Sequence, residues 1–146
     1  MSIEQINRIV EIEKSKGKVV VMGCGCFEIF HIGHLEYLQE AKGYGDILII
    51  GINSDEYIRK YKKREPKFNE EQRSRIISSI KYVDYVFVFE ERTFDYSLRK
   101  LKPNYFVKGI DRLNVLEKET CEECSIKIEI VGEEKRSSST DLLQYF

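Results

Sequence analysis

Short apolar runs alternate with helix-like segments along almost the whole of this chain of 146 residues, and that alternation restricts its fold more than any other feature. The run at residues 46–52 is the clearest, because its continuous apolar character is typical of a parallel strand covered on both faces. Four further strands are predicted at residues 18–22, 84–89, 105–107 and 126–131. Strands separated by helices indicate βαβ units. We therefore predict an α/β fold, with a Rossmann-like, doubly wound, five-stranded parallel sheet in a single domain that spans residues 1–146.

The segments between the strands carry apolar residues at helical spacing. Ile12 and Ile76 are among the residues expected on the buried sides of these helices, and Asn69 and Gln72 have the spacing of a capping box. A basic, turn-prone stretch at residues 60–67 is expected to interrupt the pattern. The helices expected are residues 3–14, residues 34–42, one opened by Ser54, one opened by Asn69, residues 94–101, residues 115–123 and a short one near Ser139.

Charge and hydropathy exclude several classes of protein. The formal net charge is −1, whereas a general nucleic-acid binder is usually clearly basic. Residues 2–16 are charged throughout and lack the apolar centre of a signal peptide. No apolar run approaches the roughly 20 residues that span a bilayer. We expect a soluble, cytoplasmic protein with neither nucleic acid nor membrane as a partner.

The chain has four cysteines, in one C-x-C pair and one C-x-x-C pair. Four thiolates in a tetrahedral array suit zinc, but C-x-C is not the usual spacing of a zinc knuckle. A redox C-x-x-C follows a strand at the start of a helix, whereas Cys121 lies near the end of a predicted helix. Reduced cysteines without a metal are therefore expected, and zinc is the minor alternative.

A turn rich in glycine and cysteine follows the strand at residues 18–22 and runs into the chain's only two histidines. Glycine lets backbone N–H groups approach a phosphate closely, and imidazoles can donate hydrogen bonds to phosphoryl oxygens. The start of a helix adds free N–H groups and the positive end of its dipole. The alternative is that both histidines are ordinary helix residues. The residues expected to contact a nucleotide here are Gly25, Cys26, Phe27, His31, Gly33 and His34.

Two further stretches are candidate contacts, although each has an ordinary alternative. The five cations of residues 60–67 could cover a triphosphate, or could belong to a solvated loop in which no single lysine stands out. Lys108, Gly109, Asp111 and the neighbouring Arg112 follow the strand at 105–107 and could contact ribose, base or acceptor phosphate. Glycine and aspartate are also routine in structural turns.

The last stretch, residues 135–140, brings cations and hydroxyls to the start of the final predicted helix. Hydroxyls and free amides beside cations can form a second phosphate site, although simple N-capping by serine or threonine is the alternative. The nucleotide contacts expected here are Arg136, Ser138, Ser139 and Thr140.

Residues 25–34, Gly-Cys-Phe-Glu-Ile-Phe-His-Ile-Gly-His, resemble the G-x-F-D-x-x-H-x-G-H signature of the cytidylyltransferase-like nucleotidyltransferases. Residues 138–142 resemble the family's S-[ST]-T-x-[IL] motif, and residues 81–86 its R-Y-V-D-x-V segment. The likeness covers nearly the whole chain and is strongest to the heptose-1-phosphate adenylyltransferase branch, through residues 89–93 and 107–111. One departure is Glu28, which stands where the family has aspartate.

The resemblance implies transfer of a nucleoside monophosphate from ATP or CTP to a phosphorylated sugar or polyol, with release of pyrophosphate. It implies that His31 and His34 bind the triphosphate and stabilise the charge that develops in the reaction. Among the cations of residues 60–67, it implies that Lys63 contacts the phosphates. Ser139 and Thr140 would hold the β and γ phosphates. It also implies Mg²⁺ bound largely by nucleotide and water, no metal site of the protein's own, and a homodimer.

Other functions remain open. Glycerol-3-phosphate and ethanolamine-phosphate cytidylyltransferases share the general motifs. A non-catalytic nucleotide-binding sensor would bind nucleotide without releasing pyrophosphate. Class I aminoacyl-tRNA synthetases also contain a His-x-Gly-His segment, but this chain is too short to add tRNA-binding domains.

Overall fold

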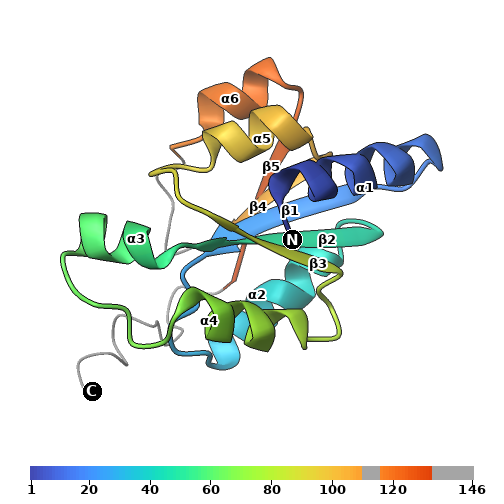
Figure 1. The fold of residues 1–146 in the computed structure, drawn as a ribbon. Coiled ribbons are helices and arrows are strands. Elements are labelled where there is room, and N and C mark those ends of the chain that lie inside the picture. Colours follow the sequence, from blue (N-terminus) through green and yellow to red (C-terminus); the bar gives the residue numbers. More distant parts are fainter. Residues whose placement is uncertain (110–115, 133–146) are drawn as a thin grey trace.

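A computed structural model describes residues 1–109 and 116–132 of the chain, and its centre is one wholly parallel sheet (Figure 1). The strand order β3-β2-β1-β4-β5 confirms the predicted Rossmann-like α/β sheet of five strands. In register, Val20 lies beside Ile47 and Tyr105 lies beside Lys127. The strands are β1 (Val20–Gly25), β2 (Ile47–Asn53), β3 (Tyr85–Phe89), β4 (Tyr105–Gly109) and β5 (Lys127–Val131).

Helices cover both faces of the sheet (Figure 1). One face packs against α1 (Ile3–Ser15), α5 (Asp95–Leu101) and α6 (Lys118–Glu123). The other face packs against α2 (Ile32–Lys42) and α4 (Glu70–Ser78). Between β2 and α4 the chain forms the short helix α3 (Asp55–Tyr57) and a single π-helical turn, η1 (Ile58–Lys62), which stand apart from both layers.

The core follows from the alternation of side chains along each strand. Met22 and Ile49 are fully buried on the side of α1 and α5, whereas Val21 and Ile50 are fully buried on the side of α2 and α4. Strands that are buried on both faces explain why β1 and β2 are continuously apolar in sequence.

The starts of the helices confirm the predicted caps. Asn69 Oδ1 accepts the N–H of Gln72 at 2.8 Å, and Gln72 Oε1 accepts the N–H of Asn69 at 3.0 Å, so the capping box is complete. Ser54 Oγ accepts the N–H of Tyr57 at 3.0 Å. In the described part of the chain, the helices are too short or too polar to cross a membrane.

Three expectations about the helices were wrong. Ile12 and Ile76 are exposed rather than buried; Ile12 lies about 160° around its helix from the buried Val10, and Ile76 about 100° from the buried Ile77. Residue 116 is in a turn and α6 begins only at Lys118. The segment 58–62, expected as a turn-prone stretch from residue 60, is η1 instead. The helix expected near Ser139 lies outside the described residues.

Candidate active site

The candidate site lies where the chain leaves β1. From β1 the sheet grows through β2 and β3 on one side and through β4 and β5 on the other, so the strand order reverses at β1. The hydroxyl of Tyr37 in α2 donates to the carbonyl oxygen of Val107 in β4 at 2.6 Å and thereby holds α2 across this point. A Cβ at Gly23 would lie 2.1 Å from the Tyr37 hydroxyl, so glycine is needed for this contact.

The turn between β1 and α2 is folded tightly around Phe27. Phe27 has a left-handed backbone, with φ at 49°, and its ring lies over Gly25, where a Cβ would come within 2.9 Å of Cε2. The same ring meets His34 edge-on, with 5.0 Å between centroids. Gly25 was expected to open the backbone to a phosphate, and in the structure it also makes room for the phenylalanine that supports His34.

The two histidines form a stacked pair at the start of α2, with ring centroids 3.9 Å apart and 27° between planes. His31 is the N-cap residue, and its Nδ1 accepts the N–H of Gly33 at 3.0 Å. With Nδ1 acting as an acceptor, the proton of a neutral ring sits on Nε2. The structure therefore brings together the predicted pair and fixes the tautomer that makes Nε2 of His31 a hydrogen-bond donor.

Glu28 lies in the same turn and is buried beneath cations of the segment 58–67. Its Oε1 is 2.5 Å from Nη2 of Arg64, and its Oε2 accepts from Nη1 of Arg64 at 2.9 Å and from the N–H of Lys67 at 3.2 Å. Burial alone would raise the pKa of Glu28, but these hydrogen bonds and the charges of Arg64 and Lys62 hold that pKa below its ordinary value. Glu28 is therefore an anion tied to the basic segment.

The basic segment was expected as a loop free to cover a triphosphate, with Lys63 as its contact. Lys63 is exposed and left-handed, with φ at 55°, and it ends η1. Its neighbours Lys62 and Arg64 both approach Glu28, Lys62 with its Nζ 3.8 Å from Oε1. Sequence reasoning missed Arg64 as an anchor, although the unusual Glu28 was the signal that could have indicated it.

Arg73 was also missed as a site residue. It is fully buried, and its Nη1 donates to the carbonyl oxygens of Cys26 at 2.9 Å and of Asn53 at 2.6 Å. Its Nη2 donates to Asp55 Oδ1 at 2.8 Å, and its Nε to the carbonyl of Phe68 at 2.9 Å. One guanidinium thus joins the ends of β1 and β2 to the starts of α3 and α4.

Lys108 is buried at the end of β4, beside Gly109. Its Nζ lies 3.5 Å from Oε1 of the buried Glu117, whose Oε2 accepts the N–H of Phe94 at 2.9 Å. The structure therefore pairs Lys108 with Glu117, a partner that the sequence did not indicate. The other predicted contacts, Asp111, Arg136, Ser138, Ser139 and Thr140, lie outside the described residues, as does Arg112.

None of the four cysteines, all of which lie in the described part of the chain, is in a disulfide. Cys26 donates from Sγ to Asn53 Oδ1 at 3.5 Å, which links the first turn to the end of β2. Burial, reinforced by the charge of Glu117, raises the pKa of Cys121 to about 12, so this thiol is not a ready metal or redox ligand. Across residues 1–109 and 116–132 no three His, Cys, Asp or Glu side chains cluster as metal ligands.

Comparison with known proteins finds one family model that matches most of the chain. The family model described as Cytidylyltransferase-like matches residues 22–144. The protein named Bifunctional protein HldE from Geobacter metallireducens is 36% identical over 145 residues, which cover 97% of this chain and 30% of that protein. The protein of the same name from Helicobacter acinonychis is 43% identical over 128 residues, which cover 83% of this chain and 27% of that protein. The chain therefore spans less than a third of the length of these relatives.

Two solved structures share the fold. A lipopolysaccharide core biosynthesis protein from Thermoplasma volcanium has 29% identity and a TM-score of 0.71, covering 82% of this chain and all of that one. A pantoate-beta-alanine ligase from Francisella tularensis has 17% identity and a TM-score of 0.60, and the match covers 94% of this chain and 73% of that one. This likeness concerns the fold alone.

Proposed function

Because the chain belongs to the cytidylyltransferase-like family of nucleotidyltransferases, we propose that it transfers a nucleoside monophosphate from ATP or CTP to a phosphorylated sugar or polyol. Pyrophosphate leaves in the same step. The preferred pair is ATP with heptose-1-phosphate. Its support is the motif resemblance and the likeness to a protein of lipopolysaccharide core biosynthesis, a product built from sugars.

The observation that carries this proposal is the stacked histidine pair at the N-terminus of α2. An acceptor phosphate is already nucleophilic at neutral pH, so its oxygen can attack the α-phosphorus in line while the bond to pyrophosphate breaks. Such a reaction needs positioning and charge stabilisation rather than a strong base. Nε2–H of His31 is a donor for a phosphoryl oxygen, and the N-terminus of α2 favours negative charge at the same place.

Further contacts complete the proposed site. Lys63 would meet the triphosphate from the basic segment, and Lys108 and Asp111 would lie toward the nucleoside or the acceptor. Ser139 and Thr140, with Arg136, would hold the distal phosphates. Mg²⁺ would arrive with the nucleotide and neutralise part of its charge. We place this enzyme, as one domain over residues 1–146, in the cytoplasm, where free thiols such as these four stay reduced.

A screen of pyrophosphate release tests the proposal. It crosses ATP and CTP with heptose-1-phosphate, glycerol-3-phosphate and ethanolamine phosphate, in the presence of Mg²⁺. Turnover with heptose-1-phosphate and ATP is expected. Turnover with another pair would correct the acceptor or the nucleotide. Nucleotide binding without turnover for any pair would instead favour the sensor.

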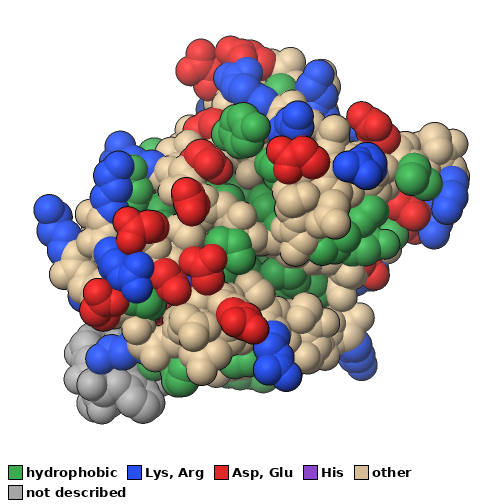
Figure 2. Space-filling view, viewed as in Figure 1, with side chains coloured by type: hydrophobic (Ala, Val, Ile, Leu, Met, Phe, Trp, Pro, Cys, Tyr) green, Lys and Arg blue, Asp and Glu red, His purple; other side chains and the backbone are tan. Residues whose placement is uncertain are grey.

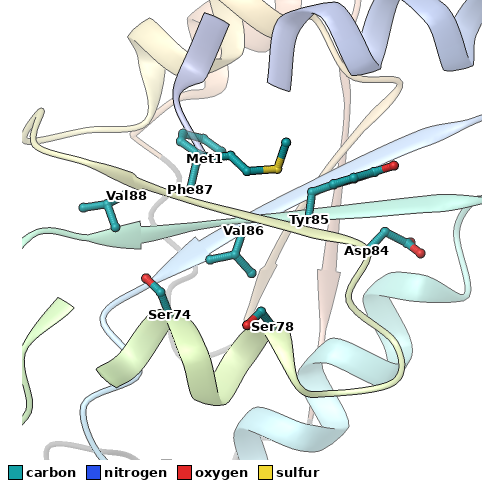
Figure 3. A pocket seen from close by; sticks show the side chains of 8 residues that line it. All are labelled: Met1, Ser74, Ser78, Asp84, Tyr85, Val86, Phe87 and Val88. Atoms are coloured by element: carbon teal, nitrogen blue, oxygen red, sulfur yellow. The ribbon is translucent and has the colours of Figure 1, made fainter. Parts of the chain in front are cut away.

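We further propose a homodimer that pairs along β3. Among the described strands β3 has a neighbour, β2, on one side only, so its other backbone edge is available for a second strand. Hydrophobic side chains gather over β3 on the face seen in Figure 2, and a groove of about 400 Å³ lies beside it (Figure 3). Its lining residues are Met1, Ser74, Ser78, Asp84, Tyr85, Val86, Phe87 and Val88. Light scattering would report twice the chain mass of 17.3 kDa.

A further inference from the structure

We propose that Glu28 and Arg64 form a positioning pair that fixes the basic segment, residues 58–67, against the turn leading to the two histidines. Both nitrogens of the Arg64 fork contact the carboxylate, at 2.5 and 2.9 Å. The side chain of Glu28 is only 1% exposed, whereas that of Arg64 is 31% exposed. Glu28 is thus a buried anion of the turn, and Arg64 is a partly exposed cation of the segment. The catalytic consequence of this pair depends on the proposed function.

The contacts of Glu28 show that its role is to hold the segment. Oε1 faces Arg64 and Lys62, and Oε2 faces Arg64 and the N–H of Lys67, so both oxygens are engaged by residues of the segment. An anion at this place would repel a triphosphate if it were left uncompensated. Arg64 removes that repulsion. Because its fork is occupied by Glu28, Arg64 is a positioning residue and not a phosphate ligand.

The extra methylene of glutamate gives this pair its reach. Bidentate contact requires both carboxylate oxygens to meet the planar fork of arginine at once. An aspartate at position 28 would withdraw the carboxylate by about one carbon–carbon bond, roughly 1.5 Å. Glu28 and Arg64 are therefore a matched pair, and neither lysine at 64 nor aspartate at 28 reproduces it fully.

The segment also contains an arginine that serves as an internal control. Arg59 contacts Glu56 at 3.1 Å and Glu65 at 3.0 Å, but the side chains of all three residues are at least 46% exposed. Surface ion pairs of this kind contribute little. Removal of Arg59 thus deletes one arginine and one positive charge from the same segment without freeing it from the turn.

The pair determines where the neighbouring ammonium groups sit. Lys62 and Lys63 immediately precede Arg64, and Lys63 already ends η1 in a left-handed conformation. Without the Glu28–Arg64 pair, these ammonium groups would be held only by a short helix and an exposed turn. We expect nucleotide binding and the chemical step to suffer together, because the cations would be disordered in both states.

The experiment compares Glu28→Gln, Arg64→Gln, the double variant, Glu28→Asp and the control Arg59→Gln. Loss of a charged, bidentate contact should lower kcat/KM about 10- to 100-fold in both single glutamine variants, through a higher KM for nucleotide and a lower kcat. The double variant should lose little more than either single one, since both remove the same interaction. Glu28→Asp should recover part of the loss, and Arg59→Gln should remain within about twofold of the wild type.

A second measurement does not depend on turnover. Trypsin should cleave after Lys62, Lys63 and Arg64 faster in folded Glu28→Gln than in the wild type or in Arg59→Gln, because the segment is released from the turn. Mass spectrometry identifies the cleavage sites. This comparison needs no substrate, so it tests whether Glu28 and Arg64 hold the segment even if the wild type releases no pyrophosphate. A wild type without pyrophosphate release would count against the proposed function alone.

Three outcomes would overturn the proposal. One is additive losses in the double variant. Another is a Glu28→Gln enzyme with unchanged or lower KM beside an Arg64→Gln enzyme with a raised one, which would make Arg64 a direct phosphate ligand. The third is equal trypsin cleavage of the segment in Glu28→Gln and wild type. If Glu28→Gln does not fold, Arg64→Gln at its partly exposed position still allows the kinetic comparison with Arg59→Gln.

Discussion

At the scale of single residues, His31 has one observed role and one proposed role. Its Nδ1 caps α2 through the N–H of Gly33, so that the proton of a neutral ring is on Nε2, the atom to which the proposed function assigns the phosphoryl oxygen. The ring of His34 stacks on that of His31, and Phe27 meets His34 edge-on from the turn. A residue that only capped the helix could be replaced by any short acceptor, whereas the proposed chemistry needs the ring.

Replacing His31 by asparagine or alanine separates these roles. Asparagine is a strong N-cap, so His31→Asn should keep the wild-type melting temperature, while His31→Ala should lose about 1 kcal/mol of unfolding free energy. Both should lower pyrophosphate release about 100- to 1,000-fold, as is usual when a preorganised donor to a developing charge is removed. Thermal melts and steady-state kinetics on the same samples check this. Near wild-type turnover in His31→Asn would restrict His31 to its capping role.

The sequence was enough to predict that the two histidines lie together, because they are close along the chain. His31, Gly33 and His34 lie within one turn of one helix, so their spacing alone brings them together. Glu28 and Arg64 are 36 residues apart, and only the packing of η1 beside the first turn shows that they meet. The sequence therefore indicated which residue was unusual but not what it contacts.

At the scale of elements, Arg73 joins the ends of two strands to the starts of two helices. It reaches from α4 to the carbonyl oxygens of Cys26, at the start of the turn after β1, and of Asn53, at the end of β2, and to the first residue of α3. Those carbonyls are buried and need donors, and a guanidinium can serve several of them from one place. The arginine thereby sets the position of Cys26, and through it the turn that carries Glu28 and His31.

Arg73→Met should therefore damage both stability and activity. Removing one partner from a buried charged network costs about 3–5 kcal/mol, which corresponds to a fall of roughly 6 to 20 °C in melting temperature for a chain of this size. Calorimetry measures the fall, and kinetics well below the new melting temperature should still show a lower kcat/KM, because the first turn has lost its support. Arg75→Met, in which an exposed arginine of the same helix is replaced, is the control and should change neither quantity appreciably. A wild-type melting temperature in Arg73→Met would contradict this account.

Most elements were predictable because strands and helices here obey simple periodicities. The exceptions are instructive. Helical spacing did not distinguish Ile76 from its buried neighbour Ile77, since the width of the buried stripe depends on what lies opposite it. The turn η1 has no periodic pattern of apolar residues in the sequence. It lies between α3 and Arg64, which pairs with Glu28, so tertiary contacts rather than local preference define it.

At the scale of the whole molecule, the order of the strands determines where a ligand can bind. In parallel sheets ligands bind beyond the carboxyl ends of the strands where the order reverses, and in this chain α2 begins at that place, next to β1. A nucleotide bound there would contact segments from both halves of the sheet. Its binding energy would add to the stability of the whole fold, because the unfolded chain has no such site.

A rise in melting temperature with nucleotide is therefore expected. At a nucleotide concentration about 100 times the dissociation constant, binding adds about 2.7 kcal/mol to the unfolding free energy, or roughly 5 to 10 °C for a chain of this size. Thermal melts with ATP or CTP, each with Mg²⁺, should show this rise for the nucleotide that is the enzyme's substrate, and a smaller rise for the other nucleotide. His34→Ala should reduce the rise, whereas Arg59→Gln should leave it unchanged. Equal melting temperatures with and without either nucleotide at millimolar concentration would place the ligand of the histidine pair outside the nucleoside triphosphates. A rise without pyrophosphate release would leave the fold and the site in place and identify the chain as a sensor.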